Sequence, residues 1–324
     1  MKDYRRARRV GLCAVFCALV MRLWAVGVPE AVANWLTQSN IAAFLTYLET
    51  GRDVRFSSSM EAFSPDFVES PPPFLPKPTL PPLPSFSGEE EVELYYAAEK
   101  NPDIPALLTQ RLDWDLHGDE PTVLILHTHS TESYTQAGED YVETSDWRTL
   151  DENYNMLSIG ARVAEILSEN GIAVLQDREL HDYPSYNGSY TDARKSIRAY
   201  LETYPTLQLI LDLHRDASGG EGGQMRTHTS INGQDSAQLM VVLGTNHEHY
   251  EENLSLGLKL HTQLERQNPG ITRPLQLRAA RFNQDLCTGA LLIEVGAAGN
   301  HHKEALLAAE ALAQAIVALA KGTQ

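Results

Sequence analysis

The sequence predicts an α/β domain with a mostly parallel central sheet of five to six strands and helices on both faces. From Pro121 onward, short apolar runs alternate with amphipathic segments of helical length. Such alternation is typical of parallel strands joined by helices that cover the sheet. Ahead of this domain, an arginine-rich, apolar N-terminus and a proline-rich stretch predict a membrane segment and a tether.

The expected strands are five apolar runs, at residues 122–127, 172–177, 207–216, 236–246 and 290–300. The expected helices are amphipathic segments, at residues 153–171, 191–205, 253–270 and 302–321. Gly171 suits the position just after the first helix, where glycine commonly takes a left-handed conformation. Thr191 is the expected N-cap of the second helix.

The N-terminal region divides into two segments before the main domain. In residues 1–30, four arginines precede an apolar run, which predicts a single-pass anchor with its basic flank in the cytoplasm. A cleaved signal peptide is the alternative, because Ala31–Ala33 reads Ala-Val-Ala, as at a peptidase site. Residues 31–100 are expected to form a juxtamembrane helix and a proline-rich, acidic linker. Either reading places the main domain, residues 101–324, outside the cytoplasm.

The charge balance excludes one class of partner. The chain has 43 acidic and 26 basic residues, a formal net charge of −17. A protein that binds nucleic acid needs a basic surface to neutralise phosphates. We therefore expect no nucleic-acid partner.

Polar residues that suit a metal site follow three of the predicted strands. His127, His129 and Glu132 follow the first strand, and alternation along a strand predicts that the two histidines share a face. His214 ends the third strand, and Glu294 lies inside a late apolar strand. In open α/β sheets, ligands bind outside the carboxyl ends of the strands. We therefore expect these residues to meet at one edge of the sheet.

Imidazole and carboxylate groups are the ligands of catalytic zinc, which keeps one position for water. His214 is the expected ligand, with His127 or His129 as its partner. The carboxylate ligand is Glu132, or alternatively Asp151 or Glu152. A buried carboxylate is costly unless it is paired, metal-bound or protonated, so Glu294 is expected to be the catalytic base. The alternative for Glu294 is a buried ion pair with an arginine.

Further polar residues were assigned from their position in the sequence. The candidates for substrate binding are Arg215, Tyr186 in a tyrosine-rich loop, and Asn283. The other histidines are expected in a surface loop or at the start of the last helix, and they are His247, His249, His301 and His302.

Five motifs, in this order and spacing, resemble the stage II sporulation protein P family of cell-wall hydrolases from endospore formers. They are LILHTHSTESY, HDYPSYNGSY, LILDLHRDA, TRPLQLRAARFNQDL and LLIEVGAAGN. The resemblance covers about residues 100–322. His214 and Glu294 match the second histidine and the catalytic glutamate of the wider zinc amidases, but HTHST replaces their glycine-rich first motif. In those relatives the glutamate ligand opens a helix, which favours Asp151 or Glu152 over Glu132.

The resemblance implies a zinc-dependent N-acetylmuramoyl-L-alanine amidase with a zinc-amidase-like fold and an additional endopeptidase activity. It implies peptidoglycan as the substrate, a partner that resembles the lytic transglycosylase stage II sporulation protein D, and action at the sporulation septum during engulfment.

A barrel-type amidohydrolase is excluded, because such barrels need about 250 residues. The remaining alternative is a membrane-tethered wall-binding or scaffolding protein with a vestigial metal site.

Overall fold

The structure is a computed structural model that describes residues 86–97, 100–112, 114–135, 147–217, 219–220 and 223–321. The expected membrane segment, the juxtamembrane helix and most of the proline-rich tether lie outside the described residues. Among the helices that are described, none combines the length and the apolar character needed to cross a membrane.

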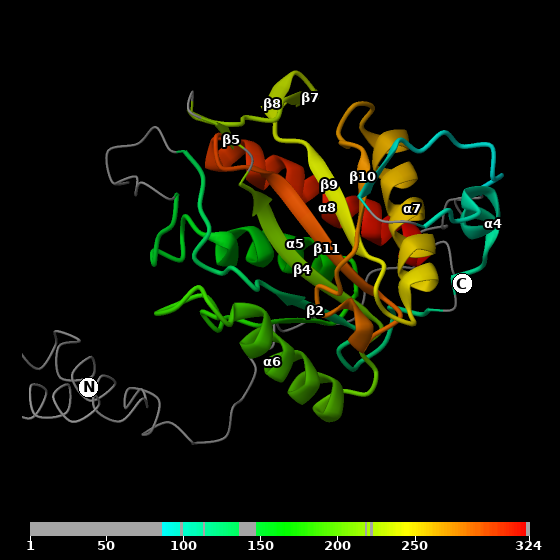
Figure 1. Cartoon of the computed structure of the whole chain (residues 1–324), viewed down its shortest axis with the longest axis horizontal. Helices are drawn as coiled ribbons and strands as arrows, with labels where there is room; N and C mark the ends of the chain where they lie inside the picture. The colour runs from blue at the N-terminus through cyan, green and yellow to red at the C-terminus, as the bar shows by residue number, and fades with distance from the viewer. Residues whose placement is uncertain are drawn as a thin grey trace, which may run out of the picture. The chain divides into compact units, whose positions relative to one another are not determined.

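A seven-stranded sheet forms the centre of the domain, in the order β1-β10-β9-β11-β4-β2-β3 (Figure 1). Its strands are β1 (Leu94–Ala97), β2 (Val123–Leu126), β3 (Val174–Gln176), β4 (Leu209–Asp216), β9 (Leu239–Gly244), β10 (Leu275–Arg278) and β11 (Ala290–Ala297). Neighbouring strands pair in parallel, except that β9 is antiparallel to β11. The sheet therefore contains two parallel groups that run in opposite directions.

The sheet has more strands than the five to six that we expected. The two additional strands, β1 and β10, are only four residues long, so neither gives a clear apolar run. Strand β1 pairs with β10, with Leu94 opposite Leu275, although its residues were assigned to the linker. Two short hairpins lie outside the main sheet, β5 (Gly219–Gly220) with β6 (Gly223–Gln224), and β7 (Thr229–Ile231) with β8 (Gln234–Ser236).

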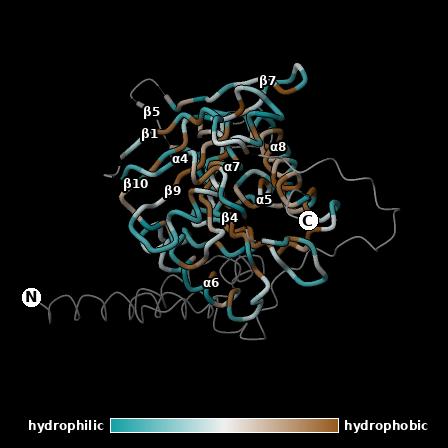
Figure 2. The backbone as a smooth tube through the Cα atoms, turned by 90° about the vertical axis from the view of Figure 1, so that its right-hand side faces the viewer, coloured by the Kyte–Doolittle hydropathy of each residue, from teal (hydrophilic) through white to brown (hydrophobic). Residues whose placement is uncertain are grey.

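Helices cover both faces of the sheet, as predicted. One face packs against α5 (Met156–Glu169), α7 (Tyr250–Gln267) and α8 (His302–Lys321), which share the largest apolar core. The other face packs against α6 (Ser189–Thr203) through a smaller core. The short helix α4 (Ile104–Thr109) contacts α7, and a 3-10 turn, η2 (Gln284–Leu286), precedes β11. Hydrophobic segments, brown in Figure 2, run through the middle of this part of the chain.

The ends of the helices follow from capping residues. Helix α5 begins after Asn155, whose side-chain oxygen accepts a hydrogen bond from the Leu157 amide at 2.9 Å. It ends before Gly171, which has a φ of 77° and so takes the expected left-handed conformation. Helix α6 begins earlier than predicted, because Gly188 takes the N-cap position with a φ of 106°. Thr191 therefore lies inside the first turn of α6.

Candidate active site

His214 and Glu294 are direct neighbours in the sheet, at paired positions of β4 and β11. Their side chains share a face because they follow the alternation of their strands. In β4, Leu211 and Leu213 enter the core beneath α5, α7 and α8, so His214 points to the opposite face. In β11, Ile293 enters the same core and Glu294 points away from it. Both lie near the carboxyl ends of their strands, where His214 is buried and Glu294 is half-buried with its Oε2 atom shielded from solvent.

The two histidines after β2 do not share a face, which corrects our expectation. Strand β2 ends at Leu126, and residues 128–131 form a turn, so the alternation stops before His129. His127 lies beneath helix α5: its Nδ1 is 3.1 Å from the Leu213 carbonyl oxygen, and its Nε2 is 3.3 Å from the Gln176 amide nitrogen. A Cβ atom added at Gly160 would meet His127 Nε2 at 2.5 Å. His127 is therefore directed away from His214.

His129 lies beside His214 instead. Their ring centroids are 5.1 Å apart, and the rings are nearly perpendicular, at 88°. Glu132 approaches the same histidine, with its Oε2 atom 3.7 Å from His214 Nδ1. Of the two histidines left open by the sequence, His129 is thus the one placed with His214, Glu132 and Glu294.

Three polar atoms of this group are buried without a hydrogen-bond partner in the part of the chain that the structure describes. They are His129 Nδ1, His214 Nε2 and Glu294 Oε2. Buried polar atoms are normally satisfied, so unpartnered atoms in a cluster of imidazoles and carboxylates need an explanation. Two imidazoles and one carboxylate are a typical donor set for catalytic zinc, with a second carboxylate as the proton acceptor. The residue types gathered here are therefore those that a catalytic zinc site uses.

Asp212 fixes the orientation of His214. His214 Nε2 lies 2.9 Å from Asp212 Oδ1, a close contact that departs from straight hydrogen-bond geometry. Asp212 in turn accepts hydrogen bonds from the backbone amide and the hydroxyl of Thr128, at 2.8 and 2.6 Å. A carboxylate behind a ligating histidine sets its tautomer and ring orientation. This arrangement leaves His214 Nδ1, on the side of Glu132, for a ligand.

The electrostatics of the site favour added positive charge. Burial lowers the pKa of His214, but Asp212 and the other carboxylates outweigh this and raise it to about 9. Burial raises the pKa of Glu294 to about 8, because the charged form is desolvated. Burial, followed by the repulsion from His214, lowers the pKa of His129 to about 3. At neutral pH His214 therefore carries a proton in the metal-free chain. His129 is neutral at this pH and is able to ligate a metal ion.

Two arginines hold Glu132 in place. The Arg215 backbone amide donates to Glu132 Oε2 at 3.2 Å, and Arg215 Nη1 donates to Oε1 at 3.4 Å. Arg148 Nη2 lies 3.7 Å from Glu132 Oε1. Arg215 is buried and also donates to the carbonyl oxygens of Ser133 and Trp147. Its side chain therefore organises the loop after β2, whereas we had expected it to contact substrate.

The alternative carboxylate ligands lie at the surface. Asp151 and Glu152 are exposed and precede helix α5, which begins only at Met156. Asp151 accepts from the Asn153 backbone amide at 3.0 Å, and Glu152 pairs with Arg178. Neither belongs to the helix that was thought to begin there. Of the three candidate carboxylate ligands, Glu132, which is 4% exposed, is the one that lies beside His214.

Two tyrosines cover the site, Tyr186 from the loop between β3 and α6 and Tyr190 from the first turn of α6. The Tyr186 ring stacks on His129 with a centroid distance of 4.4 Å, and it is exposed to solvent on its outer side. Tyr190 meets His129 edge-on at 5.6 Å and lies parallel to His214 at 6.4 Å. Sequence reasoning named Tyr186 but missed Tyr190, whose only signal was its place in the same tyrosine-rich stretch.

Asn283 positions Tyr190 rather than facing an open pocket. Its side-chain amide donates to the Tyr190 carbonyl oxygen at 2.9 Å, and it accepts from Arg194 at 3.3 Å. It is 9% exposed. Asn283 and Phe282 both have left-handed backbone conformations, with φ of 58° and 51°. The expected substrate-binding residue is therefore buried support for the tyrosine beside His214.

The other histidines lie away from this cluster. His247 and His249 are partly exposed and immediately precede helix α7. His302 is the first residue of helix α8, as expected, and its Nε2 is 2.8 Å from the Ser158 hydroxyl. His301 directly precedes it and hydrogen-bonds within the same turn.

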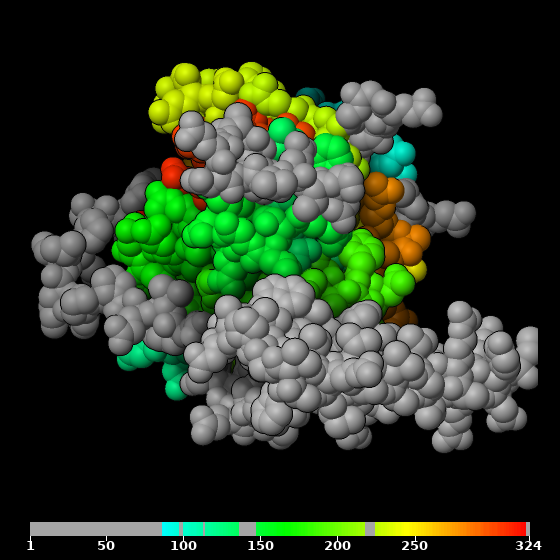
Figure 3. Space-filling model, turned by 90° about the vertical axis from the view of Figure 1, so that its left-hand side faces the viewer, coloured from blue at the N-terminus to red at the C-terminus, as the bar shows by residue number. Residues whose placement is uncertain are grey.

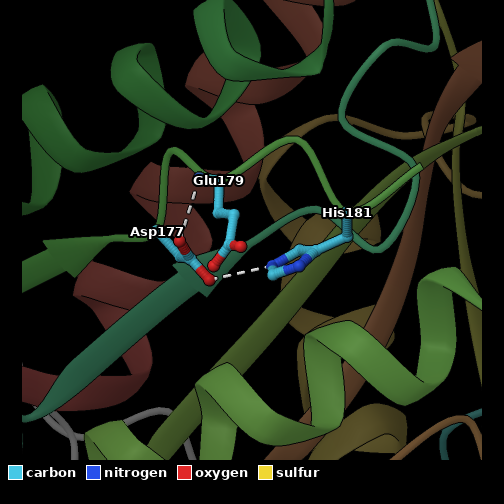
Figure 4. A group of neighbouring side chains, drawn as sticks. All are labelled: Asp177, Glu179 and His181. Carbon is cyan, nitrogen blue, oxygen red and sulfur yellow. Dashed lines mark hydrogen bonds and ion pairs between the residues drawn. The ribbon is translucent and has the colours of Figure 1, made fainter. Parts of the chain in front are cut away.

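A second group of potential metal ligands follows β3. Among the described residues, Asp177, Glu179 and His181 have ligand atoms within 4.8 Å of one another (Figure 4). His181 Nε2 is 2.9 Å from Asp177 Oδ2, and both residues are buried, whereas Glu179 is exposed. This spacing allows a metal ion. The only signal in the sequence was the spacing of these three residues, which occupy alternate positions of the segment after the strand.

Comparison with known proteins assigns the family. The model of the family described as Stage II sporulation protein P matches residues 85–317. This chain belongs to the stage II sporulation protein P family. It is similar to "Stage II sporulation protein P" of Bacillus subtilis (strain 168), with 29% identity over 207 residues, 60% of this chain and 50% of that protein. The chain thus spans about half the length of the curated relative that it matches.

Several solved structures are similar over most of their own length. They include the N-acetylmuramoyl-L-alanine amidase AmiC2 of Nostoc punctiforme, with 14% identity, a TM-score of 0.37, and coverage of 64% of this chain and 97% of that one. The CwlD amidase from Clostridioides difficile, in complex with the GerS lipoprotein, has 16% identity, a TM-score of 0.39, and coverage of 60% and 94%. The Ami1 amidase from Mycobacterium smegmatis has 15% identity, a TM-score of 0.39, and coverage of 63% and 95%.

Proposed function

We propose that this protein is a zinc-dependent N-acetylmuramoyl-L-alanine amidase, which hydrolyses the amide bond between the muramic acid of peptidoglycan and its stem peptide. One observation carries the proposal: Glu294, whose buried Oε2 atom has no partner, is paired in the sheet with His214, and His129 and Glu132 both lie beside His214. Membership of the stage II sporulation protein P family supports a role in sporulation.

The ligands would be His129, Glu132 and His214. Zinc, when bound, supplies a Lewis acid that polarises the scissile carbonyl and lowers the pKa of water. We place zinc here rather than at Asp177, Glu179 and His181, because Asp177 and His181 already satisfy each other at 2.9 Å. The first group also has an adjacent proton acceptor.

The chain's own residues would then perform the proton transfers and the positioning. Glu294 takes a proton from the attacking water and returns it to the leaving nitrogen, a role that needs a carboxyl whose pKa lies near the working pH. Burial already moves the pKa of Glu294 to about 8 in the metal-free protein. Asp212 holds His214 in its tautomer, while Arg215 and Arg148 fix the direction of Glu132. Tyr186 and Tyr190 limit access of solvent to His129.

The setting of the enzyme is part of the same proposal. The expected anchor would place the domain outside the cytoplasm, at the membrane of the sporulation septum. A lytic transglycosylase similar to stage II sporulation protein D would supply cut glycan strands. The same site would also cleave the peptide cross-links.

The test uses the purified full-length chain in detergent, with peptidoglycan as substrate and mass spectrometry of the products. The wild type should release stem peptides, lose this activity on chelation, and regain it with zinc. Glu294→Gln should bind zinc as the wild type does and release no peptide, whereas His214→Ala should lose zinc. His181→Ala is the matched control and should retain the zinc that supports activity. If the folded, zinc-loaded wild type releases no stem peptides, a wall-binding scaffold is the better description.

A further inference from the structure

A cleft adjoins the candidate active site on the side of Tyr186. It has a volume of about 750 Å³, and residues 131, 148–150, 182–184 and 186 line it. We call it the tyrosine cleft. Figure 3 shows the left-hand side of Figure 1, where green segments, the colour of residues near 150 to 190, form much of the surface. Pockets of this size are typical of sites for small organic ligands.

The tyrosine cleft concentrates exposed apolar side chains. Among the described residues, five large hydrophobic side chains are exposed, and three of them line this cleft: Leu150 at 50%, Tyr183 at 39% and Tyr186 at 53%. The other two, Tyr95 and Tyr96, belong to strand β1. Exposed apolar groups gathered at one place mark a binding surface more often than scattered ones do. Tyrosine offers a flat apolar ring with a hydroxyl at its edge, so it can contact both apolar and polar parts of a ligand.

The cleft is continuous with the predicted zinc ligands. Tyr186 lines the cleft and stacks on His129 at 4.4 Å. The Arg148 guanidinium lies 4.5 Å from the centroid of the Tyr186 ring and also approaches Glu132. A ligand in the cleft would therefore lie next to the scissile amide, if that amide is bound at His129 and His214.

The charged groups of the cleft neutralise each other. Arg148 Nη1 is 2.5 Å from Asp182 Oδ2, and Asp182 also accepts from the amide and hydroxyl of Thr131, at 3.1 and 2.7 Å. Their charges and hydrogen-bonding groups are engaged within the protein. A ligand that fits this cleft needs no net charge, and the chain's net charge of −17 disfavours an anionic one.

These observations select between the two halves of a muramoyl-peptide substrate. The stem peptide is anionic. The glycan is neutral, because the carboxyl group of its muramic acid is consumed in the amide bond, and its pyranose rings have apolar C–H faces that stack on aromatic rings. We propose that the tyrosine cleft binds the neutral β-1,4-linked N-acetylated glycan chain beside the scissile amide. This inference rests on the proposed function, since it specifies which part of that substrate enters the cleft.

The test measures binding without turnover. Full-length Glu294→Gln protein is titrated calorimetrically with chitohexaose, a neutral β-1,4-linked N-acetylglucosamine chain, and separately with free stem tetrapeptide. Chitohexaose should bind, and replacing both Leu150 and Tyr183 with alanine should weaken binding about tenfold, because removing an aromatic contact and an apolar wall together is worth about 1.4 kcal/mol. Tyr183→Phe keeps the ring and should retain affinity. Tyr95→Ala, which removes an exposed tyrosine from β1, is the matched control and should have no effect.

The possible results separate this inference from the proposed function. Absence of chitohexaose binding, or equal binding by the alanine double variant, overturns the glycan assignment even if the wild type is an active amidase. Binding of the stem peptide that is lost in the double variant also overturns it, and assigns the cleft to the peptide. Chitohexaose binding that is weakened in the alanine double variant supports the glycan assignment, even if zinc-loaded wild-type protein hydrolyses no amide.

Discussion

Removing the buried charge of Glu294 should change how the stability of the metal-free protein depends on pH. Burial raises the pKa of this carboxyl from 4.5 to about 8 in the folded chain. The folded state therefore binds the Glu294 proton more tightly than the unfolded state, and stability falls as pH rises from about 4.5 to about 8. Each tenfold change in proton affinity is worth about 1.4 kcal/mol, so the full loss has an upper limit of about 5 kcal/mol.

Glu294→Gln removes this loss, because glutamine does not ionise. We expect the free energies of unfolding of the two chelated proteins to change in parallel below about pH 4.5. Between that pH and about pH 8, the variant should become progressively more stable than the wild type. Denaturant unfolding at several pH values, with chelator present throughout, measures the difference. The other titrating groups are shared, so most of their effect cancels.

Zinc supplies the control for this measurement. A cation beside Glu294 favours the ionised carboxylate, so zinc should reduce the pH dependence of the wild type. A difference between wild type and Glu294→Gln that stays constant from pH 4.5 to 8 without metal would refute the reasoning. It would mean that Glu294 ionises as easily in the folded chain as in the unfolded one.

Three further predictions concern the surroundings of the site. Asp212→Asn should weaken zinc binding about 10- to 100-fold, because it removes the carboxylate that orients His214; competition with a chromophoric chelator measures this, and unchanged affinity would contradict that role. Gly160→Ala should lower the free energy of unfolding by about 1 to 3 kcal/mol, because the added Cβ would meet His127 Nε2 at 2.5 Å. Unchanged denaturant unfolding would argue against that packing. Burial lowers the pKa of His181, but the hydrogen bond that His181 donates to Asp177 outweighs this and raises it. The stabilisation from this pair is therefore present at low pH and lost as pH rises through the folded pKa. Asp177→Asn should therefore lower the melting temperature more at pH 6 than at pH 9, and an equal decrease at both would contradict the pairing.

The residues that could be predicted lie in long, regular strands. His214 and Glu294 sit in eight-residue, mostly apolar strands that are easily recognised, so their meeting at one edge of the sheet follows from the sequence. His129 could not be distinguished from His127 in the same way. Strand β2 stops at Leu126, and the turn that follows it is determined by contacts with distant residues, such as Thr128 with Asp212.

Short strands and the direction of strand pairing could not be predicted from the sequence either. Strands β1 and β10 are stable only as partners of each other and of β9, and pairing of this kind leaves little trace in four residues. The antiparallel pairing of β9 with β11 has no local signal, because a fully buried strand is apolar whichever way it runs. The group of Asp177, Glu179 and His181 escaped notice because it depends on the path of a loop.

The order of strands also decides where a mechanical load would enter the domain. The first described strand along the chain, β1, lies at one border of the sheet, and β10 and β9 separate it from β11. Tension on the chain before residue 86 therefore acts first on the contacts of Phe86 and Glu90 with Arg266, and then on the pairing of β1 with β10, before it can reach His214 and Glu294. A pull from that direction would detach the border strand before it disturbed the paired positions of His214 and Glu294.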